Sequence, residues 1–226
     1  SKDVEIARLS GIYAANLGKA GVDLVHGRAV FKDAHTVEVT HRDGGETRTI
    51  TAEKILIATG GRPWMPKDLK GVEHAITSEE AFHLPELPKR ILIAGGGYIA
   101  VEFAGIFAGL GVETTLIYRG PNILRGFDDD VRAHLAGEIE KRGIKVVLGC
   151  QHSSIEKTET GLVSHLENGM TMEHDVIMFA TGRTPHVVDL GLEKVGVELN
   201  DKGAIKVDTL SRTTADNIWA IGDVTD

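Results

Sequence analysis

A glycine-rich hexapeptide offers the clearest chemistry in the sequence. Residues 95–100 read Gly-Gly-Gly-Tyr-Ile-Ala, which fits G-x-G-x-x-A between an apolar strand and a helical pattern. In such a turn Gly95 allows the tight bend, Gly97 lets a pyrophosphate approach the backbone, and Ala100 lets helix and strand pack closely. The free N–H groups at the helix start bind anionic oxygen. The hexapeptide therefore predicts a dinucleotide-binding site.

Two arginines after the next predicted strand indicate which dinucleotide binds. In an NAD site this strand ends in Asp or Glu, whose carboxylate accepts hydrogen bonds from the ribose hydroxyls. Here the strand at 113–118 is followed by Arg119, and Arg125 lies six residues further on. A carboxylate would repel a 2′-phosphate, whereas a guanidinium binds it with two parallel hydrogen bonds. The two arginines favour NADP over NAD; the alternative is a pair of solvated surface arginines.

Tyr98 and Glu102 stand four residues apart on the helix that follows the glycine turn, so they share one face. Glu102 interrupts an otherwise apolar run, and a buried carboxylate is costly unless it is paired. A functional role for Glu102 therefore needs a cation from elsewhere in the protein. The alternative is an exposed tyrosine and glutamate near the start of a helix.

Hydrophobic periodicity predicts the elements that hold these residues. After Pro88 a strand, a helix, a strand, a helix and a strand follow one another. They are predicted at 90–94, 98–110, 113–118, 128–142 and 145–148. This alternation predicts a parallel, doubly wound sheet of the α/β class. A meander of three short strands and an apolar strand at 175–180 come next.

The part of the chain before Pro63 has a related pattern. An amphipathic helix is predicted over 4–17. Period-two strands follow at 22–31, 36–41 and 47–52, then an apolar strand at 54–59. The strands at 54–59 and 175–180 both end in Ala-Thr-Gly, so we expect two versions of one architectural unit. The alternative is two buried strands that each end at a Gly-Pro turn.

Four prolines within 26 residues mark a crossing between two domains. They are Pro63, Pro66, Pro85 and Pro88. We expect one domain to contain 1–63 and to continue at 213–226. Residues 64–88 are expected to form the crossing, and residues 89–212 the second domain.

Composition narrows the function further. The net charge of −8 gives no electrostatic footprint for nucleic acid or an anionic membrane, although it leaves room for a local basic pocket. Residues 91–112 have the length of a membrane span but contain Glu102 and six glycines, so a strand, a turn and a helix fit them better. Cys150 is the only cysteine, which excludes an intrachain disulfide and fits a packed thiol in a reducing compartment.

Together with residues 58–63, 180–183 and 218–223, these motifs resemble the pyridine nucleotide-disulfide oxidoreductases. Within that family they are most similar to the glutathione reductase branch of bacterial type, over essentially the whole chain. Dihydrolipoamide dehydrogenases resemble the chain elsewhere but carry an acid at the position of Arg119. The resemblance implies two Rossmann-like dinucleotide-binding domains with β-meander insertions. Residues 1–63 and 213–226 would then belong to an incomplete FAD-binding domain, and residues 89–212 would form the NADPH-binding domain.

The resemblance also implies roles for single residues. Those expected to contact FAD are Ala29, Thr59, Gly60 and Asp223. Those expected to contact NADP, with the glycine turn included, are Gly95, Gly96, Gly97, Ile99, Ala100, Glu102, Arg119, Arg125, Gly182 and Arg183. Tyr98 matches the gate over the nicotinamide pocket and Glu102 matches the partner of a flavin-side lysine. These two are the candidate catalytic residues.

The implied activity is an FAD-dependent NADPH:disulfide oxidoreductase that reduces a small disulfide, glutathione disulfide, as a cytoplasmic homodimer without nucleic-acid or membrane partners. The family's first G-x-G-x-x-G, its C-x4-C redox pair and its His-Glu pair are missing from these residues. We therefore expect the chain to be the central part of a longer enzyme and to be inactive alone. No histidine pattern predicts a metal site. The alternatives are a trypanothione, mercuric or other disulfide reductase, or a nucleotide-binding module without chemistry of its own.

Overall fold

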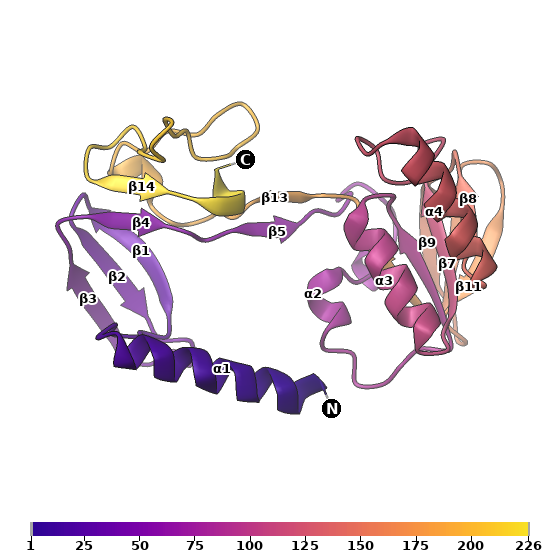
Figure 1. Cartoon of the computed structure of the whole chain (residues 1–226), viewed down its shortest axis with the longest axis horizontal. Helices are drawn as coiled ribbons and strands as arrows, with labels where there is room; N and C mark the ends of the chain where they lie inside the picture. Colours follow the sequence, from indigo (N-terminus) through magenta and orange to yellow (C-terminus); the bar gives the residue numbers. More distant parts are fainter. Residues whose placement is uncertain (1, 226) are drawn as a thin grey trace. The chain divides into compact units, whose positions relative to one another are not determined.

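The computed structural model describes residues 2–225 and divides into two compact units (Figure 1). The first unit contains the chain up to Gly60 and from Pro185 onward. The second unit is continuous from Gly61 to Thr184. The glycine turn and both arginines of the predicted NADP site lie in the second unit.

A four-stranded parallel sheet forms the centre of the second unit, in the order β12-β6-β7-β8. Its strands are β6 (Arg90–Ala94), β7 (Glu113–Tyr118), β8 (Lys145–Leu148) and β12 (Val176–Phe179). Helices α3 (Tyr98–Gly109) and α4 (Asp129–Lys141) connect β6 to β7 and β7 to β8. Figure 1 shows both helices on the same side of the sheet. The predicted α/β class is confirmed.

The opposite face of this sheet carries a β-meander in place of a helix. It consists of β9 (His152–Lys157), β10 (Leu162–Leu166) and β11 (Thr171–His174), paired antiparallel. Successive side chains of a strand point to opposite faces. Ile91 and Ile93 of β6 accordingly pack with the helices, whereas Leu92 and Ala94 pack with the meander. A doubly wound sheet would have helices on both faces, so the sequence-based prediction was wrong in that detail.

Residues 64–88 belong to the second unit rather than to a crossing between units. They contain the 3₁₀ turn η1 (Val72–His74) and helix α2 (Ser78–Ala81). Ile76 forms a parallel bridge with Met178 of β12, and the Ile155 N–H donates to the Lys70 carbonyl at 2.8 Å. The prolines interrupt regular structure, but the apolar residues between them still pack against the sheet.

The first unit has a smaller meander and a short parallel pair. The meander is β1 (Arg28–Asp33), β2 (Thr36–Thr40) and β3 (Thr47–Thr51), and β4 (Ile55–Ile57) pairs in parallel with β14 (Ile218–Ala220). The strands β5 (Gly61–Pro63) and β13 (Arg183–Pro185), which except for Pro185 belong to the second unit, follow the two Ala-Thr-Gly ends and pair with each other. The 3₁₀ turns are η2 (Leu192–Lys194) and η3 (Gly222–Val224). In each unit a three-stranded meander is therefore followed by a parallel strand, β4 in the first unit and β12 in the second. This agrees with the two versions of one architectural unit that the sequence predicted.

Residues 185–212 lie in the first unit, although the sequence-based expectation placed them in the second domain. Leu190, Val195 and Ile205 share a buried core with Phe31 and Ile218. The observed boundary is thus between 184 and 185 instead of between 212 and 213. No periodic signal marks this segment, because its residues are mostly irregular and their burial depends on partners far along the chain.

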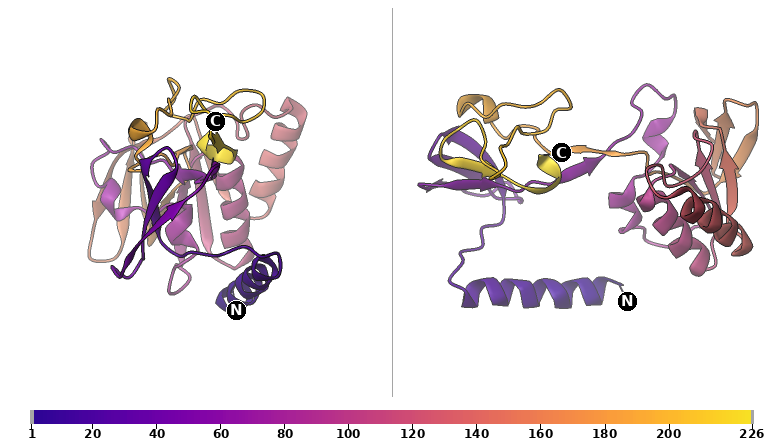
Figure 2. Two further views of the ribbon diagram at one scale, coloured as in Figure 1. Left: turned by 90° about the vertical axis from the view of Figure 1, so that its left-hand side faces the viewer. Right: turned by 45° about the horizontal axis from the view of Figure 1, so that its top comes forward.

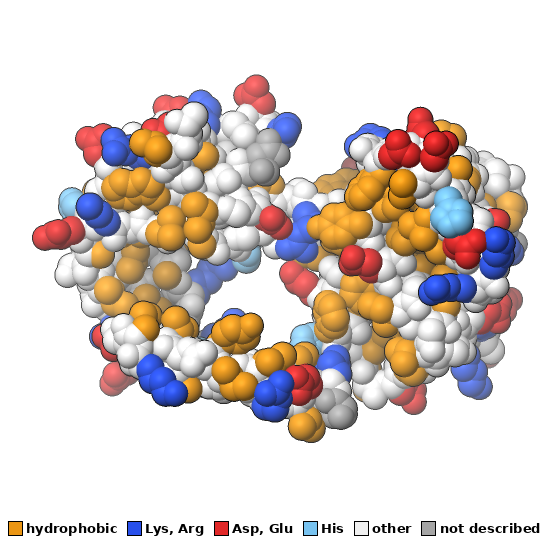
Figure 3. Space-filling view, in the orientation of Figure 1, with side chains coloured by type: hydrophobic (Ala, Val, Ile, Leu, Met, Phe, Trp, Pro, Cys, Tyr) orange, Lys and Arg blue, Asp and Glu red, His pale blue; other side chains and the backbone are white. Residues whose placement is uncertain are grey.

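Helix α1 (Lys2–Lys19) forms as predicted but has no buried residue among those described. Its exposed apolar side chains are Val4, Ile6, Leu9, Ile12, Tyr13 and Leu17 (Figure 3). Figure 2 shows the extended stretch that joins α1 to the meander, and β1 starts at Arg28 rather than at the predicted residue 22. None of the helices within residues 2–225 combines the length and apolarity that crossing a bilayer requires.

The second unit should fold on its own, because its sheet, both helices and the meander lie within Gly61–Thr184. We expect a protein of residues 61–184 to unfold in a single cooperative transition and to bind NADPH within about threefold of the whole chain, a difference of less than about 1 kcal/mol. Thermal melting and nucleotide titration check this. A non-cooperative melt of this piece would contradict it.

Candidate nucleotide-binding site

A cleft of about 570 Å³ lies at the carboxyl end of the parallel sheet, wholly within the second unit. Its walls come from the strand ends, the start of α3 and the segment after β5. The lining residues are Trp64, Pro66, Leu69, Ala94, Gly95, Gly96, Gly97, Tyr98, Ile99, Ile117, Tyr118, Arg119, Arg125, Cys150, Gln151, His152, Phe179, Ala180, Thr181, Gly182 and Arg183. In open α/β sheets ligands bind at this edge.

The glycine turn is part of the cleft lining. Gly95 has a φ of 144°, and a Cβ there would lie 2.3 Å from the Ala180 carbonyl oxygen. Ala100 is fully buried next to Gly95. Gly97 caps α3 without any side-chain hydrogen bond, and a Cβ at Gly97 would meet nothing within 4 Å. The first N–H groups of α3 therefore remain available to an anion that approaches over Gly97.

The side chains that line the cleft carry positive charge, although the chain as a whole is negatively charged. Arg119, Arg125 and Arg183 line the cleft, and no Asp or Glu is among its lining residues, whereas the whole chain has a net charge of −8. Arg119 and Arg125 are exposed. The Arg183 guanidinium donates a hydrogen bond to the Gly61 carbonyl. The preceding residue, Gly182, has a φ of 152°. Three guanidinium groups near a helix N-terminus suit a ligand with several phosphates.

Two buried histidines contribute no positive charge at neutral pH. His152 lines the cleft, with Nε2 3.1 Å from Ser164 Oγ. His174 has Nε2 3.4 Å from Thr115 Oγ1, and its buried Nδ1 has no hydrogen-bond partner among the described residues. Burial lowers the pKa of each histidine to about 4. The nearby His174 lowers the pKa of His152 by a smaller amount, and the nearby Arg90 does the same for His174. The arginines alone therefore supply the charge.

Tyr98 and Glu102 lie on the exposed face of α3, as expected for residues four apart. Tyr98 lines the cleft and is 57% exposed. Glu102 is exposed, is not a lining residue, and has no ion pair or hydrogen bond from its carboxylate within residues 2–225. This matches the alternative of a solvated helix start. A catalytic role for either residue remains a prediction.

The residues assigned to FAD lie in the first unit. Thr59 and Gly60 follow β4, and Asp223 follows β14. Because β4 and β14 are parallel, these residues meet at one sheet edge, where the Ile221 N–H donates to the Ile57 carbonyl at 3.0 Å. Thr59 Oγ1 donates to the His186 carbonyl at 2.8 Å. Ala29 lies on β1 in the separate meander sheet.

Sequence reasoning missed part of the cleft wall. The missed residues with aromatic, amide or imidazole side chains are Trp64, Tyr118, Gln151, His152 and Phe179. Tyr118 and Phe179 end strands of the parallel sheet, so the rule that ligands bind at carboxyl ends would have found them. Trp64 could not be found in this way. The backbone N–H of Trp64 donates to the Gly182 carbonyl at 2.9 Å, and these two residues are far apart in the chain.

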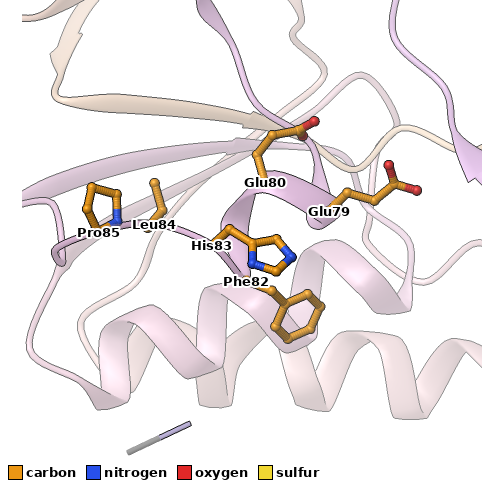
Figure 4. Close-up of a pocket in the computed structure, with 6 residues that line it drawn as sticks. All are labelled: Glu79, Glu80, Phe82, His83, Leu84 and Pro85. Atoms are coloured by element: carbon orange, nitrogen blue, oxygen red, sulfur yellow. The ribbon is translucent and has the colours of Figure 1, made fainter. Parts of the chain in front are cut away.

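A second hollow, of about 690 Å³, is lined by α2 and the residues that follow it. It is lined by Glu79, Glu80, Phe82, His83, Leu84 and Pro85. Figure 4 shows these side chains pointing in different directions from one short segment. Glu80 is engaged in the cap of α2, since its Oε2 accepts from the Thr77 N–H at 2.7 Å. The polar side chains of this hollow do not converge on a common point, so the hollow has no arrangement that would bind a ligand.

The parallel sheet, its glycine turn and the arginine-lined cleft together define a dinucleotide-binding protein. Residues 4–226 match the family model described as pyridine nucleotide-disulphide oxidoreductase, so the chain belongs to that family. Among curated relatives, glutathione reductase of Burkholderia cepacia is 47% identical over 225 residues, which is 100% of this chain. Trypanothione reductase of Trypanosoma congolense is 47% identical over 197 residues, or 83% of this chain.

The solved structures agree with this assignment. A Cu(II) complex of a cysteine-to-serine mutant of the HOCl-induced flavoprotein disulfide reductase RclA from Escherichia coli superposes with a TM-score of 0.89. It is 32% identical, and the match covers 97% of this chain and 50% of that chain. The chain spans 49% of the Burkholderia relative and 40% of the Trypanosoma relative. It thus represents about half the length of the relatives it matches.

The two outer glycines of the turn should respond differently to alanine. Gly97→Ala should lower NADPH affinity about tenfold, because its methyl group would occupy the open approach to α3, while the free energy of unfolding changes by less than about 1 kcal/mol. Gly95→Ala should instead cost about 1–3 kcal/mol of stability, because its φ strains any other residue. Nucleotide titration and urea unfolding of both variants check this. Equal loss of stability in both would contradict it.

Proposed function

We propose that this chain is the nucleotide-binding part of an FAD-dependent NADPH:disulfide oxidoreductase, and that its parent reduces glutathione disulfide. The observation that carries the proposal is the cleft at the sheet edge, which combines an uncapped helix N-terminus with three arginines and no acid among its lining residues. Its residues fit NADPH. The helix start and Gly97 would hold the pyrophosphate, and Arg119 and Arg125 would hold the 2′-phosphate.

Each remaining residue has a proposed part. NADPH supplies a hydride when it is bound. Tyr98 would cover the nicotinamide, since it lines the cleft and its side chain is exposed. Glu102 would pair with a lysine outside these residues. Thr59, Gly60 and Asp223 would hold FAD at the edge of the β4 and β14 pair.

The 226 residues contain one cysteine, Cys150, which is 2% exposed. They cannot form a redox disulfide among themselves, so we propose that the parent protein supplies the reactive cysteines from other residues. We further propose that the parent is a cytoplasmic homodimer. A single buried thiol is compatible with a reducing compartment.

Glutathione disulfide is preferred over trypanothione disulfide because the glutathione reductase of Burkholderia cepacia aligns with the whole chain. The trypanothione reductase aligns with a smaller share. This chain spans 49% of the glutathione reductase and 40% of the trypanothione reductase, so turnover of the parent protein is the test that separates the two substrates.

The test compares the parent protein with this chain. NADPH should bleach the flavin absorbance of the parent, and glutathione disulfide should restore it with turnover. The 226-residue chain should bind NADPH more tightly than NADH but show no turnover. If NADPH does not reduce the flavin of the parent, the oxidoreductase assignment is refuted. If the parent turns over trypanothione disulfide but not glutathione disulfide, the proposed substrate is refuted.

A further inference from the structure

The aromatic ring of Tyr118 lies against two glycines that belong to different turns of the cleft. A Cβ at Gly96 would come within 2.4 Å of the ring Cγ and 2.5 Å of Cδ1. A Cβ at Gly120 would come within 2.5 Å of Cε1 and 2.9 Å of Cζ. Neither approach is sterically tolerable, so an alanine at either position forces the ring or the backbone to move. The ring therefore spans the distance from the glycine turn to the loop after β7.

This loop, residues 119–125, is also attached to its surroundings by backbone hydrogen bonds. The Leu124 N–H donates to the Gly96 carbonyl at 2.6 Å, and Leu124 has a left-handed φ of 53°. That conformation is uncommon for a residue other than glycine. The Gly149 N–H donates to the Gly120 carbonyl at 3.0 Å. The loop is thus fixed near both ends, and Gly96 is in contact with both Tyr118 and Leu124.

Helix α4 fixes the middle of the same loop. Arg132 donates from Nε to the Ile123 carbonyl at 2.8 Å and from Nη2 to the Asn122 carbonyl at 3.2 Å. Arg119 and Arg125, at the two ends of the loop, keep their side chains exposed at the cleft. The loop therefore has a held backbone and two exposed guanidinium groups, which is the arrangement of a preorganised anion site.

We propose that Tyr118 is a positioning residue for nucleotide selection, because its ring sets the distance between the arginine-bearing loop and the glycine turn. This inference rests on the proposed NADPH function of the cleft. The pyrophosphate and the 2′-phosphate belong to one molecule, so both parts of the site must bind together. A shift of the loop relative to the turn lowers affinity for the 2′-phosphorylated nucleotide more than for one without that phosphate.

The contribution of Tyr118 comes from the shape of its ring. Its hydroxyl makes no hydrogen bond with any residue among 2–225, so Tyr118→Phe should leave the loop in place. Tyr118→Ala removes the ring and releases the loop. Gly96→Ala displaces the ring by collision. In the double variant Gly96→Ala/Tyr118→Ala there is no ring for the new methyl group to meet, so the loop should be displaced no further than in Tyr118→Ala.

The experiment measures the dissociation constants of NADP⁺ and NAD⁺, which differ only in the 2′-phosphate, for the whole chain and these four variants by calorimetry at one salt concentration. We expect Tyr118→Ala to weaken NADP⁺ about tenfold, the loss of about one charge-assisted hydrogen bond, and NAD⁺ by less than about threefold. Gly96→Ala should likewise weaken NADP⁺ more than NAD⁺. Tyr118→Phe should match the wild type, and the double variant should bind NADP⁺ as Tyr118→Ala does.

The outcomes separate this inference from the proposed function. An unchanged ratio of the two affinities in Tyr118→Ala, or a double variant about tenfold weaker for NADP⁺ than Tyr118→Ala, would overturn the role of Tyr118. If Tyr118→Ala does not fold in a thermal melt, the ratio of the two affinities in Gly96→Ala decides. If the wild type binds NADP⁺ no better than NAD⁺, the NADPH function itself fails.

Discussion

Arg119→Glu should weaken NADPH binding about 100-fold while NADH binding is retained or improved. A hydrogen bond to a charged group contributes about 1.5–3 kcal/mol, and about 1.4 kcal/mol corresponds to a factor of ten in affinity. Arg119→Ala should therefore cost about one to two orders of magnitude in NADPH affinity. The glutamate adds repulsion of the 2′-phosphate, and its carboxylate can accept hydrogen bonds from the ribose hydroxyls of NADH.

Both nucleotides should be titrated into the wild type, Arg119→Ala and Arg119→Glu at one fixed ionic strength, because exposed charges are screened by salt. Arg142→Ala is the matched control, since Arg142 is an exposed arginine of the same unit and is not a lining residue of the cleft. This control should leave both affinities unchanged. Equal losses for NADPH and NADH in Arg119→Ala would mean that the arginine supports the fold instead of recognising the phosphate.

The second large effect concerns acid stability. The free energy of unfolding should fall by about 4 kcal/mol between pH 7 and pH 5, about 2 kcal/mol for each of His152 and His174. Burial lowers the pKa of both from 6.5 to about 4 in the folded chain. The unfolded chain therefore takes up protons below pH 6.5 while the folded chain does not. Stability is complete above pH 6.5 and is lost as the pH falls from there toward 4.

The charged groups around His174 mostly act in the same direction as burial and lower its pKa. Arg90 and Lys145 face His174 and disfavour its charged form, whereas Asp175 favours that form. Urea unfolding at pH 7, 6 and 5 gives the dependence. His174→Gln should remove about half of the loss between pH 7 and pH 5, and the exposed His134→Gln should remove none. An unchanged pH dependence in His174→Gln would show that other groups cause the acid sensitivity.

The carboxylates contribute in a separate and lower pH window. Burial by itself would raise the pKa of Asp175, but hydrogen bonds from Arg90 and Lys89 together hold this pKa below its usual value. Hydrogen bonds from the Thr77 hydroxyl and N–H likewise lower the pKa of Glu80. Stability from such groups is present above about pH 4 and is lost only below it. The measurements between pH 7 and pH 5 therefore report mainly on the histidines.

The sequence by itself determined the parts of this protein that depend on local patterns. The bounds of β6, β7 and β8 agree with the predicted ranges, and α3 and α4 agree to within a residue at each end. Periodicity and the G-x-G-x-x-A turn are properties of neighbouring residues. Arg119 could likewise be placed at the end of β7 because it directly follows an apolar strand. The family assignment, which comparison with known proteins confirmed, used these same motifs.

Only the tertiary structure decided which distant segments meet. The boundary at 184 and 185, the packing of residues 64–88 against the sheet and the meander on the second face of the sheet arise from contacts between residues far apart in the chain. The same holds for the cleft wall, where Trp64, His152 and Phe179 converge. Burial of apolar side chains sets these contacts and is not directional, so no local spacing encodes them. The close contact between Gly96 and the Tyr118 ring likewise requires the adjacent parallel strands β6 and β7 to end side by side.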